Sequence, residues 1–169
     1  ATKFKRFTDN FLDLPATVTN EPFIAGDGSL MPRPPSYELA NIDWFDDRWS
    51  QVAANGAVAA YVAREGGLKG LLIDVESYGG GSGVWKHPFL YEPYRQECLA
   101  AGVAPRSAAD CVAMVRRRGR EFMEAIAAVF PDITIIFIQN PGWTGSNLVA
   151  PFVKGMLERR GDATLIDGG

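Results

Sequence analysis

The chain has 169 residues, of which 47% are hydrophobic, and its 17 basic and 20 acidic residues give a net charge of -3. This length suits one well-packed domain, and the slightly acidic balance argues against nucleic acid as a partner. The sequence has no apolar run long enough to cross a bilayer, and residues 1–10 lack the apolar core of a signal peptide, although a cleaved signal would leave no trace. We therefore expect a soluble protein, secreted or not, without a membrane partner.

The first part of the chain predicts one strand and one long loop. The aromatic stretch FKRFTDNFL indicates a short strand ending near Asp9 and Asn10. Residues 15–36 are dense in Pro, Gly, Ser and Thr, which is typical of a long irregular loop. A loop of this length is usually functional or flexible.

Three later stretches have the apolar period of a helix, with Asp43 as a candidate N-cap of the first and Ser107 with Asp110 as a capping box for the second. The arginines of the second helix are expected on its solvated outer face. We expect helices at residues 46–65, 107–130 and 147–160.

Strands are predicted between and after these helices. They are GLLIDVE at residues 70–76, ITIIFIQ at 133–139 and ATLID at 163–167. The second is nearly all apolar and β-branched, as a strand buried on both faces should be. Residues 77–104 are expected to form a long loop of glycines and aromatics. The alternation of strands and helices predicts an α/β fold with parallel strands.

Two architectures fit this order, an open doubly wound sheet and part of a (β/α) barrel. Both place the active site at the carboxyl ends of the strands, where polar side chains recur in this sequence. Because neither GxGxxG nor a P-loop is present, we favour the barrel. A full barrel takes about 250 residues, so we expect residues 1–169 to form a single partial or half TIM barrel, a fragment of a longer barrel, that self-associates as a dimer. The polar residues at the predicted strand ends are Asp9, Asn10, Asp74, Glu76, Gln139, Asn140 and Asp167.

The carboxylates of Asp74 and Glu76 are the main catalytic candidates. Residues two apart on a strand share a face, so these two point together, about 6 to 7 Å apart at Cβ, while Ile73 and Val75 face the helices. Close carboxyl groups in a poorly solvated site ionise unequally, and glycoside cleavage uses that difference. Glu76, nearer the mouth, suits a general acid, and Asp74 an orienting or charge-stabilising role. The alternative is a strand-end pair that caps loop amides or binds a cation.

The stretch GLLIDVE resembles the fourth-strand signature of chitinase-like family eighteen glycoside hydrolases, in which apolar residues lead into Asp-x-Glu and the Glu protonates the glycosidic oxygen. Asp74 and Glu76 match this ending, but Leu72 replaces a further Asp of the family pattern, which puts substrate-assisted cleavage in doubt. The same DVE also resembles family twenty-five muramidases. WFDDRW, KGLLIDVESY and GMLERRGDATLIDGG are similar to uncharacterised bacterial barrel proteins related to glycoside hydrolases.

Aromatic residues in the predicted loops support a sugar site, because sugars stack their C–H faces on aromatic rings. Trp143 is the favoured candidate. Trp44 and Trp49, in contrast, are expected in the core, and His87, the only histidine, on a loop without a catalytic role. The loop aromatics are Tyr78, Trp85, Tyr91, Tyr94 and Trp143.

The sequence thus predicts a glycoside hydrolase that uses no cofactor or metal, in which Glu76 and Asp74 act on a carbohydrate. The substrate would be bound by the other strand-end residues and by Tyr78, Trp85 and Trp143. One alternative is a non-catalytic carbohydrate-binding protein on the same scaffold. Another is a phosphoryl hydrolase whose metal ion is held by Asp74, Glu76 and Asp167. Cys98 and Cys111 are too few for a disulfide framework and wrongly spaced for zinc, and leave a single disulfide open.

Overall fold

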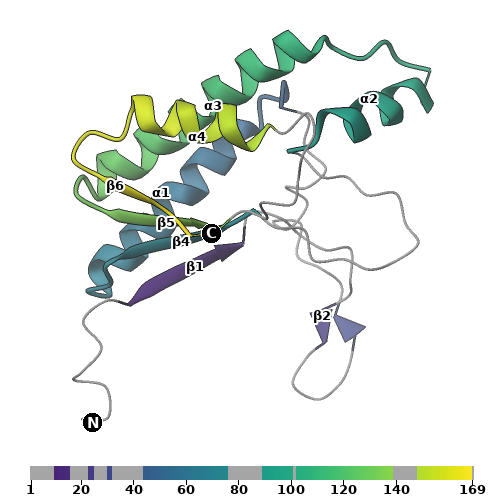
Figure 1. The fold of residues 1–169 in the computed structure, drawn as a ribbon. Helices are drawn as coiled ribbons and strands as arrows, with labels where there is room; N and C mark the ends of the chain where they lie inside the picture. Colours follow the sequence, from purple (N-terminus) through teal and green to yellow (C-terminus); the bar gives the residue numbers. More distant parts are fainter. Residues whose placement is uncertain are drawn as a thin grey trace.

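The computed structural model describes residues 10–15, 23–24, 30–31, 44–75, 89–100, 102–138 and 148–168. These residues form an α/β fold, as predicted (Figure 1). The strands are β1 (Phe11–Pro15), β2 (Phe23–Ile24), β3 (Leu30–Met31), β4 (Gly70–Asp74), β5 (Thr134–Ile138) and β6 (Thr164–Asp167). The helices are α1 (Trp49–Glu65), α2 (Tyr91–Ala100), α3 (Ala108–Val129) and α4 (Val149–Glu158).

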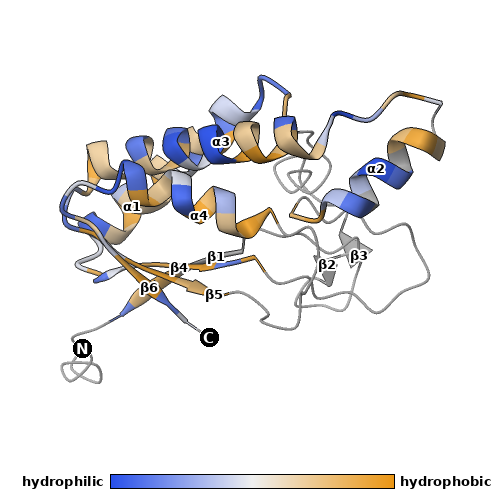
Figure 2. Ribbon diagram, turned by 45° about the horizontal axis from the view of Figure 1, so that its top comes forward, coloured by the Kyte–Doolittle hydropathy of each residue, from blue (hydrophilic) through white to orange (hydrophobic). Residues whose placement is uncertain are grey.

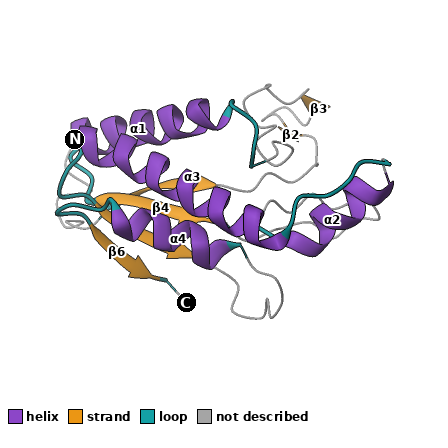
Figure 3. Ribbon diagram, turned by 90° about the horizontal axis from the view of Figure 1, so that it is seen from above, coloured by secondary structure: helices purple, strands orange, loops and turns teal. Residues whose placement is uncertain are grey.

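A four-stranded parallel sheet in the order β1-β4-β5-β6 forms the centre of the fold. Apart from the separate antiparallel pair β2-β3, the strands are therefore neighbours in the order in which the chain makes them. Helices α1, α3 and α4 lie side by side on one face of the sheet, and α2 lies beyond the carboxyl ends of the strands (Figures 1 and 3). No described helix covers the opposite face.

The burial of side chains alternates along β4 and β5, because the described helices cover only one face of the sheet. In β4 and β5 the side chains of Leu71, Ile73, Ile135 and Phe137 are at most 5% exposed and belong to the core under the helices. The residues that alternate with them, Leu72, Asp74, Thr134, Ile136 and Ile138, are only half-buried, whereas Gly70 is buried. The prediction that the strand at residues 133–139 is buried on both faces is therefore wrong for the described structure. The prediction that Ile73 faces the helices is confirmed. Figure 2 shows the hydrophobic colour of these strands.

A capping residue and small residues at contact points explain how the helices begin and pack. The predicted capping box of α3 is confirmed, since the Asp110 N–H donates to the Ser107 hydroxyl at 3.1 Å. Helices α3 and α4 approach closely because Gly119 and Gly155 lie at their crossing, where an added Cβ would fall about 2 Å from backbone oxygens of the other helix. In α1, the predicted stripe of small residues is buried, and Gly56 makes room for the Phe122 ring.

Several predicted boundaries are wrong. The first strand of the described residues is FLDLP, which begins after Asn10, where the predicted strand was to end, and the loop predicted at residues 15–36 contains the β2-β3 pair. The predicted loop at 77–104 contains α2. Helix α1 has Arg48 at its N-cap position without a side-chain cap, so Asp43, outside the described residues, is not its cap.

Two further findings bear on the sequence-based expectations. None of the described helices is long and apolar enough to span a membrane. Cys98 and Cys111, the two cysteines of the sequence, are not joined by a disulfide.

Candidate functional site

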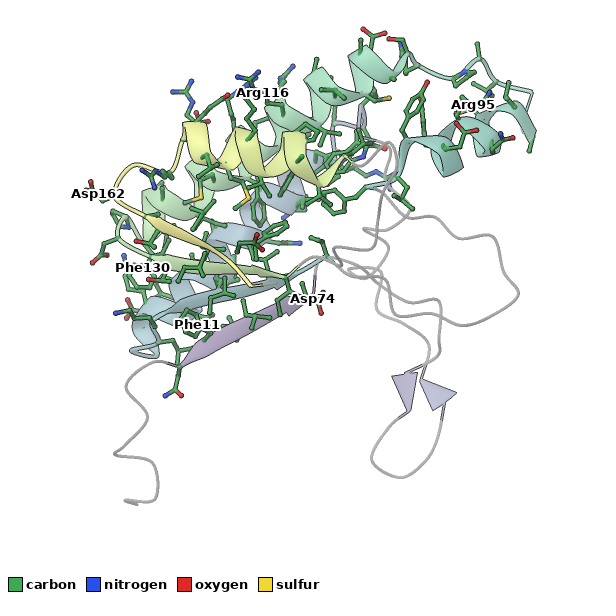
Figure 4. The ribbon with its side chains drawn as sticks, in the orientation of Figure 1. Phe11, Asp74, Arg95, Arg116, Phe130 and Asp162 are labelled. Atoms are coloured by element: carbon green, nitrogen blue, oxygen red, sulfur yellow. The ribbon has the colours of Figure 1, made fainter. Side chains whose placement is uncertain are left out.

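Asp74 is the last residue of β4, one of the two inner strands of the sheet. Its register partners are Pro15 on β1 and Ile138 on β5. Because Ile73 faces the helices, the alternation of the strand turns Asp74 to the other side of the sheet. Figure 4 shows its carboxylate at the carboxyl edge of the sheet, directed away from the helices. The structure thus places this candidate at the edge where parallel sheets bind ligands.

The surface around Asp74 is aliphatic. Leu72, Ile136 and Ile138 occupy the same face and are half-buried, and Ile166 on β6 is 43% exposed. Gly168 continues this face beyond β6: its N–H donates to the Phe137 carbonyl at 2.9 Å, and a Cβ there would lie 3.3 Å from Ile138 Cγ1. Asp74 therefore stands at the edge of a face to which β4, β5 and β6 contribute aliphatic side chains.

Asp167 ends β6 at the same edge but on the other face. It is paired in register with Phe137, which is paired with Ile73, and both partners are buried under the helices. Residues in register on neighbouring parallel strands point to the same side, so Asp74 and Asp167 point to opposite sides. Asp167 itself is exposed. These two candidates do not converge.

Asn10 lies at the wrong end of the sheet for a substrate-binding residue, which corrects its assignment. It precedes β1, and its carbonyl accepts a hydrogen bond from the Lys69 N–H, just before β4, at 2.7 Å. Both residues are therefore at the amino ends of their strands. The error arose because the strand begins at Phe11 and does not end at Asn10.

The remaining candidates lie outside the described residues, and so does His87. Val75, the residue before Glu76, is 1% exposed and donates its N–H to the Ile138 carbonyl at 3.2 Å. Strand-like pairing therefore continues past Asp74 to the residue that precedes Glu76. The candidates outside the described residues are Asp9, Glu76, Tyr78, Trp85, Gln139, Asn140 and Trp143.

Other aromatic residues have structural partners. Trp44 and Trp49 are buried, as predicted, with their rings stacked at 4.2 Å. Tyr91 and Tyr94, expected in a loop, lie on α2 and fix the segment before α3. The Tyr91 hydroxyl donates to the Arg106 carbonyl at 3.0 Å, and the Tyr94 hydroxyl accepts from the Arg106 N–H at 3.2 Å.

Most arginines of α3 form ion pairs on its exposed side, as expected, but Arg118 is buried. Arg116 and Arg120 both bind Glu158 on α4, and their hydrogen bonds lower the pKa of that carboxyl. Arg118 is only 7% exposed, contrary to the prediction. The sequence carried the signal: Arg118 follows Val115 by three residues and precedes Phe122 by four, the spacing of the buried face.

Two carboxyl groups of the described structure, those of Asp46 and Glu92, have strongly lowered pKa values. Hydrogen bonds from Arg48 lower the pKa of Asp46 to about 2, and hydrogen bonds from Arg95 and Gln96 lower that of Glu92 to about 2. Both carboxylates are paired with arginines near the ends of helices. Within the described ranges, no three His, Cys, Asp or Glu side chains are grouped to hold a metal ion.

Comparison with protein-family models, curated proteins and solved structures gives no match for this chain.

Proposed function

We propose that the protein is a glycoside hydrolase in which Glu76 is the general acid and Asp74 orients it or stabilises charge in the transition state. The observation that carries this proposal is the position of Asp74 at the carboxyl end of an inner parallel strand, on the face that no described helix covers. Glu76 follows two residues later in the sequence. The resemblance of GLLIDVE to the family eighteen strand signature supports the same roles.

Glycosidases divide the work between two carboxyl groups, one of which protonates the leaving oxygen while the other stabilises the positive charge that develops on the sugar. Glu76 would take the first role and Asp74 the second, on the face to which Leu72, Ile136 and Ile138 contribute aliphatic side chains.

We further propose that the sheet is half of a (β/α) barrel. Three properties support this: the strands are parallel, they follow one another in chain order, and α1, α3 and α4 cover a single face. A doubly wound sheet would carry helices on both faces. In a barrel the uncovered face, with Leu72, Ile136 and Ile166, would become the interior, which aliphatic side chains normally fill. A second copy would supply four more strands.

The register of the strands argues against the alternative of a metal-dependent phosphoryl hydrolase. Its ligands were to be Asp74, Glu76 and Asp167, but Asp74 and Asp167 lie on opposite faces of the sheet. A carbohydrate-binding protein without catalysis remains the competing function, and the experiment below separates the two.

The test is release of reducing sugar from a panel of polysaccharides and of chromophore from aryl glycosides, with the native chain, Glu76→Gln and Asp132→Asn. Asp132 is exposed in the turn before β5, at the other end of the sheet, and serves as the matched control. We expect activity in the native chain and in Asp132→Asn. In Glu76→Gln we expect a loss of about a hundredfold or more on polysaccharides, and a smaller loss on aryl glycosides whose leaving group needs no proton. Glycan binding without hydrolysis in all three would indicate the binding protein instead.

A further inference from the structure

Four aromatic side chains form a buried cluster beside the carboxyl edge of the sheet, which we call the aromatic anchor: Trp44, Trp49, Phe89 and Phe152. Besides its stack on Trp49, the Trp44 ring meets Phe89 edge-on at 5.2 Å and Phe152 at 5.9 Å. Phe89 and Phe152 are themselves 5.6 Å apart. All four are at most 8% exposed. Aromatic pairs at these separations add stability beyond the area that they bury.

At three places the chain leads back from a strand to the start of a helix. We call these places the returns, and the aromatic anchor connects them. Trp44 precedes α1, Phe89 precedes α2, and Leu148 precedes α4. The Leu148 N–H donates to the Phe89 carbonyl at 2.7 Å, which ties the second return to the third. Two of the returns follow stretches in which the sequence predicts binding residues: Tyr78 and Trp85 precede Phe89, and Asn140 and Trp143 precede Leu148.

Arg118 holds the first of these returns. Its Nε donates to the Trp44 carbonyl and its Nη2 to the Asp46 carbonyl, both at 3.0 Å, while Nη1 donates to Glu121 Oε2 at 2.7 Å. A buried cation is tolerated only when paired and hydrogen-bonded in this way. The planar guanidinium reaches two carbonyls and a carboxylate at fixed angles, which a lysine ammonium does not reproduce.

We propose that Arg118 is a positioning residue for the candidate site: it fixes the backbone at Trp44 and, through the Trp44–Phe89 ring contact, the Phe89–Leu148 hydrogen bond. The three returns then move as one unit. The link to a ligand rests on the proposed function, whereas the coupling between the three returns does not. Arg118 touches no candidate catalytic residue in the described structure, so any effect on catalysis is indirect.

Amide hydrogen exchange tests the coupling without a ligand. We compare Arg118→Lys with Arg117→Lys, since Arg117 also binds Glu121 but is exposed. Arg118→Lys is expected to raise the exchange rate of the Leu148 amide about tenfold, because a buried charge-assisted pair is lost, while the Ile136 amide in β5 keeps its rate. Arg117→Lys should leave both rates unchanged. Equal changes at Leu148 and Ile136, or none at Leu148, would overturn the proposal.

Phe89→Leu provides a second variant in case Arg118→Lys does not fold. It removes the ring that meets Trp44 and keeps Arg118, so it should accelerate the Leu148 amide and again spare Ile136. An unchanged Leu148 rate would mean that the ring contact carries no coupling.

The positioning role is tested on the aryl glycoside that the native chain cleaves fastest, at a temperature where each variant is fully folded. Arg118→Lys should lower kcat/KM about tenfold and leave the pH profile of kcat unchanged, because the acid and its partner stay in place. Selective exchange at Leu148 with unchanged kcat/KM would keep the coupling and refute the positioning role. Absence of hydrolysis in the native chain would count against the proposed function and leave the exchange result standing.

Discussion

Asp74 and Asp167 end two parallel strands at the same edge of one sheet, yet their side chains lie on opposite faces. Asp74 pairs with Ile138, whereas Asp167 pairs with Phe137, one residue earlier on the same strand. A shift of one residue inverts the face of a β-strand side chain. Two carboxylates that look equivalent in the sequence therefore differ in their access to the candidate site.

This difference predicts different kinetic effects of two conservative substitutions. Asp74→Asn should lower kcat on a glycoside substrate about a hundredfold or more, because a group that orients the acid or stabilises charge is neutralised. Asp167 is exposed on the helix side of the sheet, on the face opposite Asp74, so Asp167→Asn should change kcat less than about twofold. Steady-state kinetics of both variants test the prediction, and equal losses would refute the assignment of faces.

The helix crossing predicts a large loss of stability in Gly119→Ala. The new Cβ would lie 2.1 Å from the Phe152 carbonyl oxygen, so α3 and α4 would have to separate. We expect the free energy of unfolding in urea to fall by about 3 kcal/mol. Gly67→Ala is the comparison: its Cβ meets nothing within 4 Å, and its φ of +65° alone should cost about 1 kcal/mol. A smaller loss in Gly119→Ala than in Gly67→Ala would contradict the packing argument.

The arginine–glutamate pairs between α3 and α4 predict acid sensitivity. The pKa of Glu158 is lowered by hydrogen bonds from Arg116 and Arg120, although partial desolvation opposes this. The unfolded chain therefore binds a proton near pH 4.5 while the folded chain stays charged, so stability falls as the pH decreases from about 5 through the folded pKa. Urea unfolding at several pH values should show this slope, and Glu158→Gln should reduce it.

Direct titration by nuclear magnetic resonance provides the control. Arg116→Met should raise the pKa of Glu158 and leave that of Glu121 in place. Burial acts to raise the pKa of Glu121, but hydrogen bonds from Arg118 and Arg117 outweigh it and lower the value. A Glu158 pKa that does not move in Arg116→Met would contradict the stated cause.

The half-barrel proposal predicts a dimer in solution. Ile166, 43% exposed on the uncovered face of the edge strand β6, would be buried by a second copy that completes the barrel. Light scattering should therefore give twice the chain mass for the native protein and a monomer for Ile166→Glu, because an unpaired charge is not tolerated in such an interface. A clean native monomer at high concentration would refute the dimer.

Much of the fold could be predicted because strong local signals decide it. The alternating order of helices and strands, the Ser107 cap and the buried stripe of α1 follow from period and capping chemistry alone. The start of β1 could not be placed, because a short aromatic stretch fits several registers and only pairing with β4 selects Phe11–Pro15. Helix α2 was missed because its ten residues include a proline and show only a short apolar pattern at Tyr91, Tyr94 and Cys98.

The candidate site was predictable only in part. The place of Asp74 follows from strand alternation, but the face of Asp167 depends on where β6 begins relative to β5, which local sequence does not set. Asn10 was misplaced together with its strand. Arg118 was read as part of a charged run, although its spacing from Val115 and Phe122 marks it as buried.

The most direct test of the central claim is the leaving-group dependence of Glu76→Gln. A general acid matters most when the leaving oxygen is a poor leaving group, so the variant should lose about a thousandfold in kcat/KM on an oligosaccharide, but much less on a dinitrophenyl glycoside, whose leaving group needs no proton. Equal losses on both substrates, or no hydrolysis of either by the native chain, would contradict the role proposed for Glu76.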